Sequence, residues 1–179
     1  MSLTIHTELG VVRMRLRPDA APTTVAYISK LAQDGAYDGC TFYRSDFVIQ
    51  CGLHGTGRKA PENLKVNETN GESPHNSPTH PPVYACSLAH PRKSGCATAV
   101  GPRVSNTRGS AAIAHWDVPD CGNSEFFINL GTNAHLDEAY GGYCVFAQVE
   151  DDASFAIVDA IAAAVKSKSK VAVSRITCP

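Results

Sequence analysis

Short segments in which apolar and polar residues alternate dominate the chain. Residues 3–7 and 11–17 show this pattern on either side of a turn at 8–10, which predicts a β-hairpin with one buried face. Further strands are expected from residue 41 onward and at 110–114, 126–130, 143–149 and 171–176. With two shorter candidates at 87–89 and 96–100, about eight strands result, and closing them into a barrel would remove the exposed sheet edges.

Two segments instead have the spacing of an amphipathic helix. The first begins near Pro22, a residue tolerated in the first turn, and places Val25 and Ile28 on one face. The second spans residues 153–165. The predicted fold is therefore mostly β, a closed eight-stranded antiparallel barrel capped by two α-helices, and residues 1–179 form a single domain.

Composition excludes several classes of protein. The 179 residues, 43% hydrophobic and 18% charged, are typical of one soluble globular domain. The formal net charge of −1 gives no electrostatic footprint for nucleic acid or an anionic membrane. No apolar run is long enough for a membrane span, and the first residues lack the order of a signal peptide. We expect a cytoplasmic monomer, with a nuclear location left open.

The seven cysteines do not predict a disulfide framework. Their number is odd and no C-x-x-C pair occurs, so reduced, buried thiols are expected, for example at Cys51 and Cys144. Residues 58–105 hold more than half of the prolines and show almost no periodicity. A loop of this length is either functional or partly disordered.

The same loop raises the possibility of a metal site. Its histidines and cysteines are zinc ligands by type. They are His75, His80, Cys86, His90 and Cys96. Their spacing matches no C-x-x-C or H-x-x-x-H pattern, so we expect a solvated loop and no metal.

Arg44 is the most informative candidate for chemistry. It lies in an aromatic and branched apolar stretch, residues 41–49, followed by Gln50 and glycines at 52, 55 and 57. A guanidinium cannot act as a general base but offers a fixed fork of five donors. Beside apolar rings, this fork suits recognition of a carbonyl or amide. The stretch is expected to pair with residues 122–129.

The order of motifs along the chain is that of a known family. The motifs are Pro22-Thr-Thr-Val-Ala-Tyr-Ile28, Tyr37-Asp-Gly-Cys-Thr-Phe-Tyr-Arg44, Phe47-Val-Ile-Gln50, Gly55-Thr-Gly57, Asn106-Thr-Arg-Gly109, Asn123-Ser-Glu-Phe-Phe-Ile128, His135-Leu-Asp137 and Val145-Phe146. The chain resembles the cyclophilin family of peptidyl-prolyl cis-trans isomerases from residue 3 to 176, apart from an inserted loop at about 72–104. The resemblance implies an eight-stranded barrel with two capping helices and isomerase activity on X–Pro bonds in peptides and proteins.

Such an isomerase needs no nucleophile, metal or cofactor. Amide resonance sets a rotation barrier of about 18–20 kcal/mol, and twisting the bond gives the prolyl nitrogen a lone pair. A donor that binds this nitrogen better in the twisted state lowers the barrier. The resemblance assigns the donor role to Arg44.

The resemblance also assigns the surrounding residues. Arg44, Phe47 and Gln50 are the implied catalytic group, in which Gln50 orients Arg44 and binds the substrate backbone. Implied substrate contacts are Val48, Gly55, Ala114, His115, Glu125, Phe127, His135, Leu136 and Tyr143. Within these sets, the proline pocket is formed by Phe47, Val48, Phe127 and Leu136. Ala114 and His115 run alongside the peptide, Gly55 allows close backbone approach, and Tyr143 lies on the rim.

Three departures from the family pattern leave a second function open. Phe47 follows Arg44 by three residues instead of five, so Asp46 is close enough to compete for Arg44. Glu125 replaces a glutamine, and its charge is a second competitor. His135 replaces a tryptophan that favours cyclosporin, which implies weak cyclosporin binding. The alternative to the isomerase is a catalytically weak proline-peptide binding module that uses the inserted loop as a partner surface.

Overall fold

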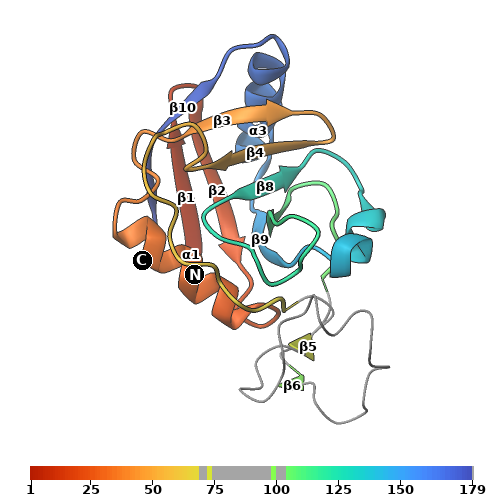
Figure 1. Cartoon of the computed structure of the whole chain (residues 1–179). Coiled ribbons are helices and arrows are strands. Elements are labelled where there is room, and N and C mark those ends of the chain that lie inside the picture. The colour runs from red at the N-terminus through yellow and green to blue at the C-terminus, as the bar shows by residue number, and fades with distance from the viewer. Residues whose placement is uncertain (69–71, 74–97, 100–103, 179) are drawn as a thin grey trace.

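A closed antiparallel barrel is the main feature of the computed structural model, which describes residues 1–68, 72–73, 98–99 and 104–178 (Figure 1). The barrel strands are β1 (Ser2–Thr7), β2 (Gly10–Leu16), β3 (Thr41–Ser45), β4 (Val48–Gly52), β7 (Ser110–Ile113), β8 (Phe126–Asn129), β9 (Val145–Val149) and β10 (Val171–Thr177). Their order around the barrel is β1-β10-β3-β4-β8-β7-β9-β2. The predicted fold class is therefore confirmed.

The alternating segments form the barrel because one face of each strand points into a shared interior. Leu3 and Ile5 of β1 and Val12 and Met14 of β2 are fully buried there. Phe126 of β8 makes edge-to-face contacts with three further rings. These rings belong to Tyr37, Phe42 and Phe146, with centroid distances of 5.6, 6.4 and 6.1 Å respectively.

Two α-helices lie at opposite ends of the barrel (Figure 1). Helix α3 (Asp152–Lys166) packs against β2 and β3, and its bounds agree with the expected 153–165. Its N-cap is Asp151, whose carboxylate accepts a hydrogen bond of 2.7 Å from the Ser154 backbone N–H. This bond lowers the pKa of Asp151.

Helix α1 (Pro22–Gln33) is capped from elsewhere in the chain. Ala21 at its N-cap offers no side-chain bond. The carboxylate of Glu68 instead accepts from the backbone N–H groups of Thr23 and Thr24 at 2.9 and 2.8 Å. Glu68 is buried, so the segment that follows β4 is tied to the start of α1.

The structure differs from expectation between β8 and β9. The residues between the strands expected at 126–130 and 143–149 contain the 3-10 helices η2 (Ala134–Asp137) and η3 (Ala139–Gly141). The strand expected at 143–149 begins at Val145 because Tyr143 leaves the ladder to bond the Leu136 carbonyl. Short i→i+3 turns of this kind have no hydrophobic periodicity that a sequence pattern would reveal.

The predicted insertion lies mostly outside the described residues. Two short strands, β5 (Glu72–Ser73) and β6 (Thr98–Ala99), pair antiparallel there. Strand β6 falls within the expected 96–100, whereas the strand expected at 87–89 lies outside the described part. The five histidines and cysteines considered as zinc ligands also lie outside it.

The cysteines in the described residues are free thiols, as expected. They are Cys40, Cys51, Cys121, Cys144 and Cys178. Burial raises the pKa of Cys144 to about 12 and that of Cys51 well above its usual range. In the described part of the chain no helix has the length and apolarity to cross a membrane.

Candidate functional site

A β-bulge in β3 places Arg44 on the outer face of the barrel. Phe42 pairs with Cys51 and faces the interior, but the next pair is Arg44 with Gln50, so Tyr43 is the extra residue. Without the bulge, Arg44 would pair with inward-facing Ile49. The bulge therefore turns the guanidinium to the side that carries Gln50.

The ladder extends this outer row across the sheet. Gln50 pairs with Phe127 of β8, and Phe127 pairs with Ala112 of β7. Directly paired residues point to the same face. Arg44, Gln50 and Phe127 therefore form one row on the outside of the barrel, although they come from three strands.

A second apolar cluster, separate from the barrel interior, lies beside this row. Its buried members are Val48, Ala112, Phe127, Leu136 and Val145, with Val104, Ala114 and Tyr143 partly buried against them. Three of the four predicted pocket residues, Val48, Phe127 and Leu136, are thus brought together.

Phe47, the fourth, lies outside this cluster. It occupies the turn between β3 and β4 with 43% of its surface exposed, and its ring is edge-on to His135 at 5.6 Å. The Arg44 guanidinium carbon lies 5.8 Å from the centroid of the same ring. Phe47, in the short turn after Arg44, therefore stays exposed beside the cluster and is not part of it.

The guanidinium of Arg44 is held from two sides. Its Nε and Nη2 contact the Asp46 carboxylate at 2.8 and 2.7 Å, so the expected competition from Asp46 is present. Its Nη1 donates to Gln50 Oε1 at 3.1 Å, which is the orienting contact expected of Gln50. Among the described residues these bonds use three of the five guanidinium donors. Arg44 is about half exposed and can still meet a ligand.

Glu125 does not contact Arg44. One carboxylate oxygen accepts from the Tyr43 hydroxyl at 2.6 Å, and the other accepts from the His54 backbone N–H at 2.9 Å. The carboxylate lies over Gly52, where a Cβ would overlap it. The competition expected from Glu125 is therefore absent, because its two oxygens have other donors.

Tyr43 is a site residue that sequence reasoning missed. Its hydroxyl donates to Glu125 and accepts from Gln50 Nε2 at 2.7 Å. Burial and the neighbouring carboxylate raise the pKa of Tyr43 well above its ordinary value. The only signal in the sequence was its place beside Arg44, since the bulge that brings Arg44 to the same face as Tyr43 cannot be read from alternation.

Of the remaining predicted residues, Ala114 and Tyr143 pack against the apolar cluster. His115 stacks on Tyr143 with ring centroids 4.2 Å apart, and Tyr143 meets Phe127 edge-on at 5.5 Å. Burial raises the pKa of Tyr143. Ala114 bonds the Glu125 carbonyl through its backbone N–H at 2.8 Å. Gly55 has a φ of +78°, which favours glycine, and the space around it is open.

A buried polar network supports the wall that carries Leu136. The Asp137 carboxylate accepts from the backbone and side-chain N–H groups of Asn106 at 2.8 and 2.9 Å. Asn129 donates to Asn106 at 3.0 Å and accepts from Asn133 at 2.8 Å. The network joins η2 to β8 and to the segment before β7, so it fixes Leu136 against the pocket. Asn106 and Asp137 lay in the motifs that carry the family resemblance, whereas Asn129 and Asn133 did not.

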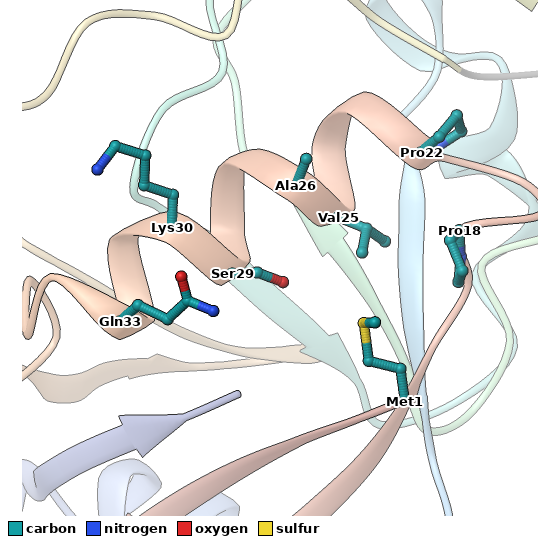
Figure 2. Close-up of a pocket in the computed structure, with 8 residues that line it drawn as sticks. All are labelled: Met1, Pro18, Pro22, Val25, Ala26, Ser29, Lys30 and Gln33. Carbon is teal, nitrogen blue, oxygen red and sulfur yellow. The ribbon is translucent and has the colours of Figure 1, made fainter. Parts of the chain in front are cut away.

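A separate pocket lies beside α1 (Figure 2). It is lined by Met1, Pro18, Pro22, Val25, Ala26, Ser29, Lys30 and Gln33. None of the predicted site residues lines it, and it contains no carboxylate, histidine or cysteine. The candidate site therefore remains the outer row and the apolar cluster beside it.

Comparison with known proteins bears on the whole chain. The family model of cyclophilin-type peptidyl-prolyl cis-trans isomerases matches residues 2–178. A peptidyl-prolyl cis-trans isomerase of Synechococcus elongatus is 34% identical over 157 residues, covering 86% of this chain and 83% of the relative. Peptidyl-prolyl cis-trans isomerase B of Bacillus subtilis is 36% identical over 148 residues, covering 81% and 80%.

Solved structures show the same fold. A Cryptosporidium parvum cyclophilin, crystallised in the presence of the dipeptide Ala-Pro, superposes with a TM-score of 0.67 at 18% identity, covering 100% of this chain and 99% of that one. The cyclophilin AquaCyp293 of Hirschia baltica gives a TM-score of 0.63, also at 18% identity, covering 98% of this chain and 73% of that one.

Proposed function

Because the chain belongs to the family of cyclophilin-type peptidyl-prolyl cis-trans isomerases, we propose that Arg44 is the residue through which it accelerates X–Pro rotation. The observation that carries this proposal is the outer row. It places a guanidinium, oriented by Gln50, in line with Phe127 and next to a buried apolar cluster.

The chemistry follows from this arrangement. The cluster of Val48, Phe127 and Leu136 accepts the prolyl ring and removes water from it. Twisting the X–Pro bond breaks amide resonance and leaves a lone pair on the prolyl nitrogen. An N–H of Arg44 donates to that lone pair, which neither planar isomer offers, so the twisted state is bound more tightly. A dry pocket strengthens this contact.

Replacing Arg44 tests the role directly. Arg44→Ala is expected to lower kcat for a proline tetrapeptide by about 100-fold or more, as for removal of a donor to a transition state. Exchange NMR measures the rate without a coupling protease. Arg108→Ala is a matched control, because Arg108 also pairs with an aspartate, Asp159, and also lies over a phenylalanine ring, that of Phe155. Turnover that survives in Arg44→Ala contradicts the proposed mechanism.

The ion pair of Arg44 with Asp46 favours a second candidate function, a proline-peptide binder with weak catalysis. In that case the pocket holds the peptide while the guanidinium stays with the carboxylate. The wild type would then bind the tetrapeptide without accelerating its exchange. The inserted loop, offered as the partner surface, lies mostly outside the described residues.

Weak binding of cyclosporin is a further proposal. His135 is exposed and its ring packs edge-to-face with that of Phe47, and an imidazole presents less apolar area than an indole would. His135→Trp is expected to bind cyclosporin more tightly than the wild type in a calorimetric titration. Equal affinity of the two proteins would contradict this reason. A monomeric state and a cytoplasmic location stay predictions, for light scattering and for imaging of a fluorescent fusion respectively.

A further inference from the structure

Four side chains form a continuous hydrogen-bonded chain from the guanidinium to a carboxylate. Arg44 Nη1 donates to Gln50 Oε1 at 3.1 Å, and Gln50 Nε2 donates to the Tyr43 hydroxyl at 2.7 Å. The Tyr43 hydroxyl donates to Glu125 Oε2 at 2.6 Å. All three distances lie in the ordinary range for such bonds.

The two ends of this chain fix the direction of every bond in it. A guanidinium can only donate, and an ionised carboxylate can only accept. Tyr43 gives its single proton to Glu125, so its oxygen must accept from Gln50. The Gln50 amide must then turn its NH2 toward Tyr43 and its oxygen toward Arg44. An amide turned the other way would set NH2 donors against guanidinium donors.

We propose that Tyr43 and Glu125 are positioning residues for the isomerase reaction, a matched pair that locks the Gln50 amide in the orientation that holds Arg44. The proposal rests on the role of Arg44 proposed above. Neither residue touches the prolyl nitrogen in this account. They act through Gln50, so their loss changes how well Arg44 is aimed and leaves the apolar pocket intact.

The carboxylate of Glu125 is needed because two donors converge on it. Oε1 receives the His54 backbone N–H while Oε2 receives the Tyr43 hydroxyl. A glutamine has one acceptor oxygen for these two donors. If that oxygen stays with the backbone N–H, its NH2 faces Tyr43, the hydroxyl turns to Gln50, and the whole chain reverses. Glu125→Gln therefore weakens the hold on Arg44 although it restores the residue common in the family.

Tyr43→Phe removes the hydroxyl and keeps the ring, which packs against His54 with centroids 4.9 Å apart. We expect a kcat about tenfold lower at unchanged KM, equivalent to about 1.4 kcal/mol in the transition state. Glu125→Gln is likewise expected to lower kcat and to leave KM unchanged. The control is Tyr27→Phe, which removes another half-buried hydroxyl, one that donates to the Glu62 carbonyl beside α1. That control keeps the wild-type kcat.

A double substitution separates positioning from general loss of structure. If Tyr43 acts only through Gln50, Tyr43→Phe causes no further loss of kcat in a Gln50→Ala background. An equal tenfold loss in both backgrounds, or a rise in KM alone, overturns the proposal. So does a wild-type kcat in Tyr43→Phe.

An NMR measurement tests the hydrogen bonds that link Arg44, Gln50, Tyr43 and Glu125 without an activity assay. The side-chain NH2 resonances of Gln50 are expected to shift in Tyr43→Phe and in Glu125→Gln, and to stay in place in Tyr27→Phe. Unmoved resonances overturn the proposal whatever the kinetics. Arg44→Ala is assayed alongside: activity in that variant refutes the proposed function, whereas an inactive Arg44→Ala with a fully active Tyr43→Phe refutes only the role of Tyr43 and Glu125.

Discussion

Asp46→Asn tests whether the ion pair with Arg44 restrains catalysis. Asp46 Oδ2 receives Nε and Nη2 of the guanidinium, while its Oδ1 accepts the Val48 backbone N–H at 3.1 Å. Asparagine keeps an oxygen for Val48 and removes the charge. The turn is therefore expected to keep its shape. The charge that competes with the substrate for Arg44 is removed.

The size of the effect follows from the exposure of the pair. The side chains of Arg44 and Asp46 are 46% and 41% exposed, and exposed ion pairs contribute about 0.2–1 kcal/mol. If Arg44 must leave Asp46 to reach the prolyl nitrogen, kcat/KM rises by about 1.4- to fivefold in Asp46→Asn. For an uncharged peptide, about 1 M salt raises wild-type activity in the same way, because the Debye length is then about 3 Å.

The assay is exchange NMR of an uncharged proline tetrapeptide at low and high salt. Asp19→Asn is the matched control, since Asp19 pairs with Arg17 at the same two-residue spacing and a distance of 2.7 Å. That variant keeps wild-type activity. A lower kcat/KM in folded Asp46→Asn would refute the reasoning, because it would mean that Asp46 aims Arg44 productively.

Two further predictions concern stability. Glu68→Gln is expected to lower the free energy of unfolding by about 1–3 kcal/mol, because one carboxylate serves the N–H groups of both Thr23 and Thr24; urea denaturation measures it, and an unchanged midpoint contradicts the cap. The pKa of Asp151 is lowered in the folded state by the N–H of Ser154, so its contribution is present above the unfolded pKa and lost as pH falls through the folded pKa. Asp151→Asn is therefore expected to flatten the acid limb of stability against pH, and an acid limb identical to that of the wild type would speak against this linkage.

The barrel could be predicted because its strands obey a simple rule. Where every second residue is apolar, as at Leu3 and Ile5 or Val12 and Met14, one face must be buried, and the structure buries it. The start of α1 followed from the tolerance of Pro22 in a first helical turn. What alternation could not supply was the second apolar cluster, since Phe126 and Phe127 look alike in sequence and only pairing assigns one to the interior and the other to the pocket.

The family resemblance predicted most of the site residues. The exposure of Phe47 and the register of β3 with β4, however, depend on backbone geometry. Phe47 follows Arg44 so closely that it falls in the turn and stays exposed at the rim. Alternation alone implies a regular pairing of β3 with β4, whereas the bulge at Tyr43 shifts their register. A bulge changes which residues face each other without changing the composition of the strand, so no hydrophobic pattern predicts it.

The surroundings of this bulge explain why Glu125 does not pair with Arg44. From the sequence, a carboxylate in place of glutamine was expected to compete with the substrate for the Arg44 guanidinium, because opposite charges attract. The bulge turns Arg44 outward beside Tyr43, and the Tyr43 hydroxyl reaches the Glu125 carboxylate while the His54 N–H donates to the other oxygen. A carboxylate that already receives two hydrogen bonds has less to gain from drawing in an exposed arginine. The departure at Glu125 therefore has to be judged together with Tyr43, and the pair tunes the site through Gln50.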